Sequence, residues 1–179
     1  MRDWALCFSP AWRGYYTCVQ RQIAAYISTI TEIRNATLMV DSSKTAVRLK
    51  YLLRNSEIEV KVIRLIRDGR AVALTYMNPA DFADSKSSAF RAGGSGGDRN
   101  SEKLSMREAA LEWKRSNEEA ECILATLNDS QWAEVRYEEY CRDPSSTLDE
   151  LFEYLGLDPA KRNKNFRAAQ NHVIGNGMR

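Results

Sequence analysis

The sequence has few of the features that mark zinc sites, secreted disulfide scaffolds and membrane spans. Its 179 residues include one histidine and four cysteines without a Cys-x-x-Cys pair, so we expect no metal site. The count leaves a disulfide open, but buried free thiols are expected because nothing else indicates a small secreted scaffold. No apolar run approaches the ~20 residues that a membrane helix requires, and charged residues interrupt the apolar N-terminal segment. These absences make a cytoplasmic protein the default expectation.

An excess of charge of one sign is also lacking. Lys and Arg number 26 against 24 Asp and Glu, which gives a net charge of +2. Binding to nucleic acid or to a membrane surface needs basic residues gathered on one face, so we expect neither partner. A pocket for a small anion remains compatible with this balance, because a few arginines scarcely change the total. With 44% hydrophobic residues the chain is expected to form one globular domain over residues 1–179.

The spacing of apolar residues predicts helices that alternate with strands. Helices are predicted at 12–34, 45–53, 71–77, 106–127 and 144–155, with Gly156 as the stop of the last, and another is expected after Pro159. Strands are predicted at 37–40, 58–66 and 132–137. Residues 85–103, rich in Ser, Gly, Lys and Asp, predict a mobile loop. This order predicts an α/β fold of three layers, with helices on both faces of a mainly parallel sheet.

Polar residues follow two of the predicted strands. Asp41-Ser-Ser-Lys44 comes after the first strand, and Arg67-Asp-Gly-Arg70 comes after the second. Ligands of open α/β sheets bind beyond the carboxyl ends of the strands, where helix amides, hydroxyls and arginines attract anions. Two interpretations stay open from these residues. Either Arg67 and Thr75 hold a phosphate, or Arg67 pairs with Asp68 in a turn while the serines cap a helix.

The segment Ile66-Arg-Asp-Gly-Arg-Ala-Val-Ala-Leu-Thr75 resembles the 3′-phosphate-binding motif of sulfotransferases, which use 3′-phosphoadenosine 5′-phosphosulfate (PAPS). The resemblance implies that Arg67 and Thr75 bind the 3′-phosphate, since Thr keeps the hydroxyl of the Ser that is usual in the family. Gly69 stands where Pro is common, which is expected to leave the turn less rigid.

Three further segments are similar to the family in the same order along the chain. Val40-Asp-Ser-Ser-Lys44 is similar to a strand-end segment of bacterial members, and Trp113 with Asn117 resembles their central helix. The segment from Val135 to Pro144, followed by Phe152-Glu-Tyr-Leu-Gly156, resembles the Tyr-Glu-Asp-Leu…Asp-Pro…Phe-Leu-Gly block. This likeness implies that Tyr137 lies near the adenine. A Tyr137 packed in the core is the alternative, and Trp113 is expected in the core.

The last residues, His172-Val-Ile-Gly-Asn-Gly-Met-Arg179, are similar to a late segment of bacterial members. The resemblance implies that Arg179 is a phosphate ligand. His172 tempts one to assign a catalytic base, but a single histidine near a chain end is more often a surface or packing residue.

The resemblance as a whole implies a P-loop-NTPase-like fold and transfer of a sulfuryl group from PAPS to a hydroxyl or amine. The acceptor would be a small molecule or a glycan, the second product would be adenosine 3′,5′-bisphosphate, and no metal is required. Ser42, Ser43 and Lys44 would line the phosphosulfate side. Asp41 and Lys44 are the candidate catalytic residues, with Asp41 as a base or as the group that orients Lys44.

One part of the family pattern is missing from the sequence. Nothing in residues 1–36 matches the Gly- or Ser-rich loop that binds the 5′-phosphosulfate, and Gly93–Gly97 follows no strand. We therefore expect a chain without its first strand–helix unit. The alternative to an active enzyme is a non-catalytic module that binds adenosine 3′,5′-bisphosphate or a protein partner. A P-loop kinase is a third alternative, which the missing loop argues against, and a homo-oligomer is left open.

Overall fold

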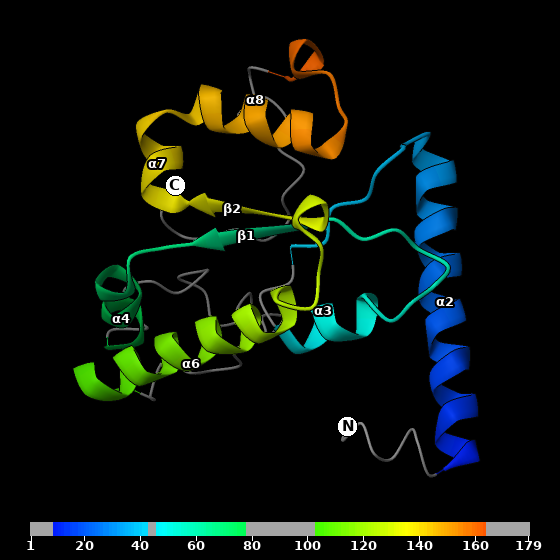
Figure 1. The fold of residues 1–179 in the computed structure, drawn as a ribbon, viewed down its shortest axis with the longest axis horizontal. Coiled ribbons are helices and arrows are strands. Elements are labelled where there is room, and N and C mark those ends of the chain that lie inside the picture. The colour runs from blue at the N-terminus through cyan, green and yellow to red at the C-terminus, as the bar shows by residue number, and fades with distance from the viewer. Residues whose placement is uncertain (1–8, 43–45, 78–102, 164–179) are drawn as a thin grey trace, which may run out of the picture. The chain divides into compact units, whose positions relative to one another are not determined.

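A computed structural model describes residues 9–42, 46–77 and 103–163 (Figure 1). The chain divides into two compact units, Met1–Lys61 and Val62–Arg179, and each is described by itself. The expectation of a single domain over residues 1–179 stays a prediction. The predicted mobile loop at 85–103 lies outside the described residues except for its last position.

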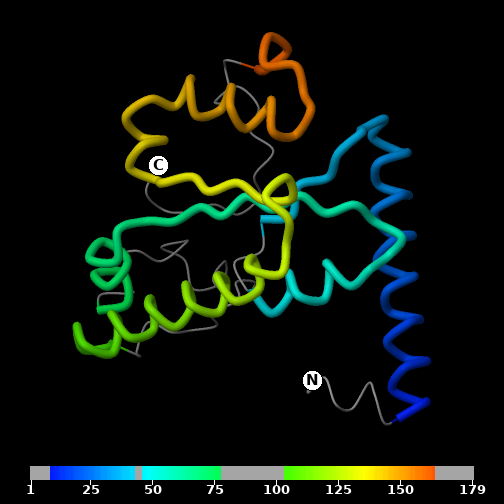
Figure 2. The backbone as a smooth tube through the Cα atoms, in the orientation of Figure 1, coloured from blue at the N-terminus to red at the C-terminus, as the bar shows by residue number. Residues whose placement is uncertain are grey.

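The first unit contains two helices, α2 (Pro10–Arg34) and α3 (Ala46–Leu52). Figure 2 traces α2 as one continuous helix. The side chain of Ser9 accepts a hydrogen bond from the Trp12 amide, and Pro10 occupies the first helical turn, where its missing N–H costs nothing. Asn35 ends the helix with a left-handed φ of 47°. Both predicted helices of this unit are confirmed.

Buried amides join α2 to the segment that contains and follows α3. The Gln20 side chain donates from Nε2 to the Tyr51 carbonyl at 2.9 Å, and Asn55 Nδ2 donates to the Gln20 carbonyl at 3.0 Å. Gln20 and Asn55 are both buried, so each bond satisfies groups that would otherwise be costly to remove from water.

The predicted strand at residues 37–40 is wrong, because these residues form no strand. Leu38, Met39 and Val40 are exposed, and Val40 retains 77% of its accessible surface. A short apolar run becomes a strand only when a neighbouring strand takes up its backbone N–H and C=O groups. In the described part of the chain the sheet has two strands, both in the second unit.

The second unit is built around the parallel strands β1 (Val62–Ile66) and β2 (Trp132–Arg136). Val62 lies opposite Trp132, and Ile66 lies opposite Arg136. The chain passes from β1 to β2 through α4 (Gly69–Met77) and α6 (Met106–Leu124). The strands predicted at 58–66 and 132–137 and the helices predicted at 71–77, 106–127 and 144–155 are therefore confirmed, with β1 shorter than predicted. The helix expected after Pro159 stays a prediction, because the described residues there form only a 3₁₀ turn at 159–161. The parallel pairing is consistent with the α/β class, but two strands are a smaller sheet than the one predicted.

Small buried residues let α4 and α6 pack closely. Ala73 of α4 and Ala109 of α6 are almost completely buried, and Leu124 and Val135 are the other buried apolar residues in the described part of this unit. The distance between packed helices depends on the side chains at their contact, so alanines favour a short one. Figure 1 shows α4 and α6 on the β1 side of the strand pair.

The polypeptide after β2 forms α7 (Tyr137–Arg142), α8 (Pro144–Leu155) and the short 3₁₀ turn η3 (Pro159–Lys161); another such turn, η2 (Asp129–Gln131), precedes β2. Asp143 caps α8 by accepting from the Ser146 amide at 3.0 Å. Gly156 ends α8 with φ 73°, as predicted. None of the helices in the described ranges has the length and apolar character needed to cross a membrane.

The expectation of buried thiols is wrong for three of the four cysteines. Cys18, Cys122 and Cys141 are free, but all three are exposed on helices. They occupy positions that face away from the cores of their units, where burial would require another element to cover them.

Candidate functional site

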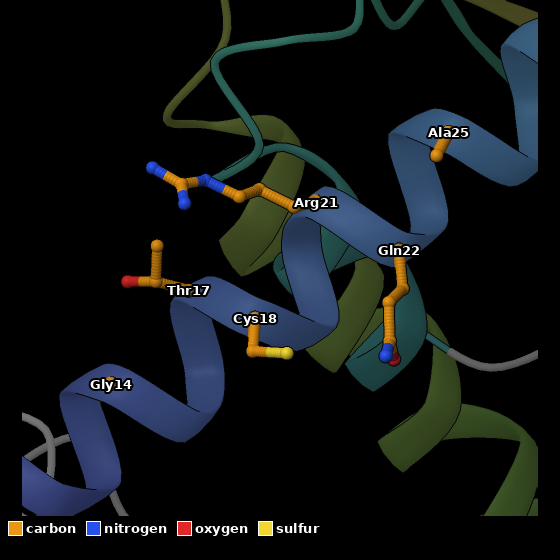
Figure 3. Close-up of a pocket in the computed structure, with 6 residues that line it drawn as sticks. All are labelled: Gly14, Thr17, Cys18, Arg21, Gln22 and Ala25. Atoms are coloured by element: carbon orange, nitrogen blue, oxygen red, sulfur yellow. The ribbon is translucent and has the colours of Figure 1, made fainter.

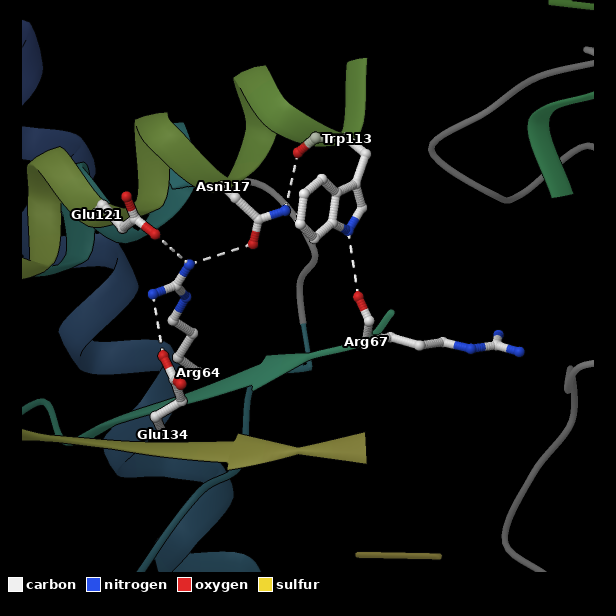
Figure 4. A network of polar contacts seen from close by, with 6 residues as sticks. All are labelled: Arg64, Arg67, Trp113, Asn117, Glu121 and Glu134. Atoms are coloured by element: carbon white, nitrogen blue, oxygen red, sulfur yellow. Dashed lines mark hydrogen bonds and ion pairs between the residues drawn. The ribbon is translucent and has the colours of Figure 1, made fainter. Parts of the chain in front are cut away.

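Two of the predicted site residues meet where the parallel strands end. Ile66 and Arg136 are the last paired residues, so Arg67 and Tyr137 leave the sheet at the same edge. The Arg67 guanidinium carbon lies 5.1 Å from the centre of the Tyr137 ring, which is a cation–π contact. Figure 4 shows the Arg67 side chain extending away from α6 and from the network around Arg64.

The Arg67 guanidinium forms no close ion pair among the described residues, although its charge interacts with the nearby Glu138 carboxylate. Asp68 pairs with Arg70, whose Nη2 lies 2.6 Å from Asp68 Oδ2. This pair lowers the pKa of Asp68 from 3.8 to about 2, mainly through the hydrogen bonds that Arg70 donates. The alternative interpretation, an Arg67–Asp68 ion pair, is therefore wrong. The N–H donors of Arg67 stay available for an anion within the described part of the site.

The turn after β1 is held by residues from two other elements. The Trp113 indole of α6 donates from Nε1 to the Arg67 carbonyl at 3.2 Å (Figure 4). The Asp68 amide donates to Glu138 Oε1 of α7 at 2.9 Å. Donation by this amide is also the main reason that the pKa of Glu138 is lowered.

Gly69 makes room for the Trp113 ring. A Cβ atom at position 69 would lie 3.0 Å from indole atom Cδ2, closer than real Cβ contacts normally come. Gly69 was expected to leave the turn less rigid. In the structure, its missing side chain leaves the space that the Trp113 ring occupies. The same geometry explains why the Pro that is common in the family at this position does not fit this chain.

Arg64 joins β1 to β2 and to α6 beneath this turn (Figure 4). It donates to Glu134 at 3.0 Å, to Asn117 at 3.2 Å and to Glu121 at 2.8 Å, and its side chain is only 12% exposed. Asn117 in turn donates to the Trp113 carbonyl at 2.8 Å. Sequence reasoning missed this network, although a charged residue in the middle of each strand was the available signal.

Comparison of the sequence with models of known protein families identifies the family of the chain. The family model described as "Sulfotransferase family" matches residues 14–161. The chain belongs to the sulfotransferase family. The match begins within residues 1–36, where no motif of the family was recognised in the sequence. No curated protein and no solved structure matches the chain. Membership supports a transferase of sulfuryl groups at the general level.

Thr75 lies in α4, is half-buried, and its hydroxyl already forms a hydrogen bond. Thr75 Oγ1 donates to the Val72 carbonyl at 2.7 Å, an ordinary contact for a helical threonine. No hydrogen bond joins Thr75 to Arg67 in the described ranges. Donation to a phosphate would require the hydroxyl to rotate away from Val72, so the predicted role of Thr75 stays a prediction.

Tyr137 is the first residue of α7 and retains 36% of its accessible surface. The alternative expectation of a ring packed in the core is therefore wrong. A hydrogen bond with Cys141 is the main cause that raises the pKa of the Tyr137 phenol. The phenol is thus neutral at physiological pH, and its ring presents an uncharged aromatic face.

The remaining predicted site residues belong to the first unit or lie outside the description. Asp41 forms an ion pair with Arg48, with 2.8 Å between Oδ2 and Nε, and Ser42 is exposed. Ser43, Lys44 and Arg179 lie outside the described residues, as does His172. The catalytic and phosphosulfate-binding roles of this group stay predictions.

One hollow on α2 was not anticipated from the sequence (Figure 3). Its described lining consists of Gly14, Thr17, Cys18, Arg21, Gln22 and Ala25. All six residues come from one helix, so the hollow has a single described wall, and we assign no function to it. Within the described ranges no group of three or more His, Cys, Asp or Glu side chains is arranged to hold a metal.

Proposed function

We propose that this sulfotransferase transfers the sulfuryl group of PAPS to a hydroxyl or amine of a small-molecule or glycan acceptor. In this proposal Arg67 binds the 3′-phosphate of the donor, and Tyr137 supports its adenine. The observation that carries the proposal is the Arg67 guanidinium, which lies over the Tyr137 ring and forms no close ion pair among the described residues.

The chemistry of these two side chains suits a 3′-phosphorylated nucleotide. A guanidinium offers several N–H donors in one plane and matches two phosphate oxygens at once. Contact with an aromatic ring restrains that plane, so less freedom is lost when phosphate binds. The Tyr137 ring also provides an apolar surface next to the cation, which is where a nucleoside attached to the phosphate would have to lie.

Transfer itself places separate demands on the chain. The acceptor oxygen or nitrogen forms a bond to sulfur while the bond from sulfur to the 5′-phosphate oxygen breaks, and a base takes the acceptor's proton. Lys44 is proposed to stabilise the charge on the departing oxygen, with Ser42 and Ser43 as donors beside it. Asp41, which forms an ion pair with Arg48, is proposed as the base.

The second candidate is a module that binds adenosine 3′,5′-bisphosphate without transferring a sulfuryl group. The observation that favours it is the sequence itself, which contains no Gly-Thr-Thr loop for the 5′-phosphosulfate. Both candidates use Arg67 in the same way, so they differ only in whether transfer occurs.

Calorimetry with adenosine 3′,5′-bisphosphate tests the half of the proposal that both candidates share. Arg67→Ala is expected to weaken binding by about 1.5–3 kcal/mol, the range for a charged hydrogen bond. Arg70→Ala is the matched control, because Arg70 is three residues away, 91% exposed and paired with Asp68. Its affinity is expected to stay within about twofold of the unmodified chain.

Adenosine 5′-monophosphate, which lacks the 3′-phosphate, makes the assignment specific. The unmodified chain should bind it more weakly, and Arg67→Ala should cause little further loss. An equal loss for both nucleotides would assign Arg67 to another part of the ligand, and no binding by the unmodified chain would sink both candidates. Transfer of labelled sulfate from PAPS to a panel of hydroxyl and amine acceptors then separates the enzyme from the binding module.

A further inference from the structure

The peptide group between Arg67 and Asp68 is held at both of its polar ends. Its carbonyl accepts from Trp113 Nε1 at 3.2 Å, and its N–H donates to Glu138 Oε1 at 2.9 Å. In a trans peptide these two groups point in opposite directions, so the partners hold the peptide plane from opposite sides. The partners lie 46 and 70 residues away along the chain, on α6 and α7.

The position of this peptide matters because it lies just beyond the last paired residues of the sheet. The hydrogen-bond ladder ends at Ile66 and Arg136, so no sheet hydrogen bond joins the two backbone segments at Arg67 and Tyr137. One residue beyond Arg67 and Tyr137, the hydrogen bond from the Asp68 amide to Glu138 links the two segments again. The cation–π pair is thus bracketed by the ladder on one side and by Glu138 on the other.

Trp113 fixes the same turn from the opposite direction. Its ring packs against Gly69, the first residue of α4, at the contact distance that leaves no space for a Cβ atom. The turn therefore cannot move toward α6 without a clash, and movement away from α6 breaks the indole hydrogen bond. Asn117 and Arg64 in turn anchor the backbone of Trp113 to the strands.

We propose that Trp113 and Glu138 are positioning residues, which clamp the Arg67–Asp68 peptide so that Arg67 stays over Tyr137 ready for a phosphate. This inference rests on the proposed function, because it assigns the clamp to the same nucleotide half-site. Trp113 and Glu138 act through Arg67 and need not touch the nucleotide. The lowered pKa of Glu138 agrees with a carboxylate that accepts the Asp68 amide proton at neutral pH.

Two variants of Glu138 separate the hydrogen bond from the charge. Glu138→Ala removes the acceptor, whereas Glu138→Gln keeps an acceptor oxygen at the same position. Glu139→Ala is the matched control, because it removes a neighbouring carboxylate from the first turn of the same helix. Trp113→Phe removes the indole N–H and keeps most of the ring.

Hydrogen exchange of the Asp68 amide, followed by NMR, measures the clamp directly. Protection should fall about tenfold in Glu138→Ala and persist in Glu138→Gln and Glu139→Ala. Calorimetry should show adenosine 3′,5′-bisphosphate binding weakened about three- to tenfold in Glu138→Ala and Trp113→Phe, with Glu138→Gln near the unmodified chain. Combined with Arg67→Ala, neither change should weaken binding further, since both act through Arg67.

The outcomes distinguish this inference from the proposed function. Unchanged Asp68 protection in Glu138→Ala would remove the clamp, and lost protection with unchanged affinity would show a clamp that positions nothing. Additive losses on the Arg67→Ala background would assign Trp113 and Glu138 a purely structural role. Each of these results overturns the inference while nucleotide binding by the unmodified chain still stands. Absence of binding by the unmodified chain would instead overturn the proposed function and the inference together.

Discussion

The turn after β1 and the segment around Asp41 have similar polar sequences, but different kinds of contact hold them. Side chains from α6 and α7 hold the Arg67–Gly69 turn, and these partners lie 46 and 70 residues away in sequence. Asp41 forms an ion pair with Arg48, only seven residues along the chain. One segment also follows a strand, whereas the other follows residues that form none.

This difference bears on which segment can hold a ligand in a fixed geometry. Contacts between distant elements place a side chain relative to the whole unit, because moving it disturbs several packed elements. A contact seven residues away constrains only the local chain. A binding constellation is precise when the residues behind it are themselves locked, and in the described structure that condition is met at Arg67.

The largest expected effect comes from removing Arg64, the arginine that supports the segment at the end of β1. Arg64→Ala should lower the free energy of unfolding by about 2–3 kcal/mol in chemical denaturation, because a nearly buried guanidinium and three hydrogen-bonded contacts are lost. The value stays below that of a fully buried pair, since Glu121 and Glu134 are 58% and 33% exposed and regain water.

Arg48→Ala is the matched change at the other segment. Arg48 is 57% exposed and pairs with the carboxylate of Asp41, so the expected loss is below about 1 kcal/mol. Equal losses for Arg64→Ala and Arg48→Ala would mean that the two segments are supported equally, contrary to the comparison.

A smaller effect, of opposite sign in the two units, is expected from glycine-to-alanine changes. Gly69→Ala should destabilise the chain by about 1–2 kcal/mol, because the new methyl group would meet the Trp113 ring at 3.0 Å. Gly14→Ala, within α2, meets nothing within 4 Å and should stabilise by up to about 1 kcal/mol through helix propensity. Thermal unfolding of both variants measures the contrast. A neutral or stabilising Gly69→Ala would show that the turn and α6 are not tightly packed.

Local signals in the sequence predicted most of the described elements. The apolar stripe at 12–34 corresponds to Pro10–Arg34, and Gly156 ends α8 where a left-handed residue was expected. The strand at 37–40 failed because pairing depends on a neighbour that no local pattern reveals. α7 was not predicted, since six residues that follow a strand directly give too short a pattern to recognise.

The candidate site divides in the same way. Arg67 and Tyr137 could be found from the sequence, because each lies in a segment that resembles a motif of the family. Arg64 and Glu138 could not, because their importance comes from the register that places Arg64 opposite Glu134 and ends the ladder at Ile66. The charged residues in the middle of the two strands, Arg64 and Glu134, are visible in the sequence, but the register that places them opposite one another is not.

The smallest expected effect concerns the charge next to Arg67. Arg70 lowers the pKa of Asp68 from 3.8 to about 2, so folding favours the ionised carboxylate. Its contribution to stability is fully present above about pH 4 and is lost as the pH falls through 2. The pair is exposed, so its effect on stability is small. The melting temperature of the unmodified chain should exceed that of Asp68→Asn slightly at pH 4, and this difference should shrink as the pH falls to 2.

The sharper measurement is the pKa of the Asp68 carboxyl group by NMR. Arg70→Ala should raise this pKa toward 3.8 and Arg67→Ala should scarcely move it. The reverse order would mean that Asp68 occupies Arg67, and the guanidinium would then not be available to a phosphate.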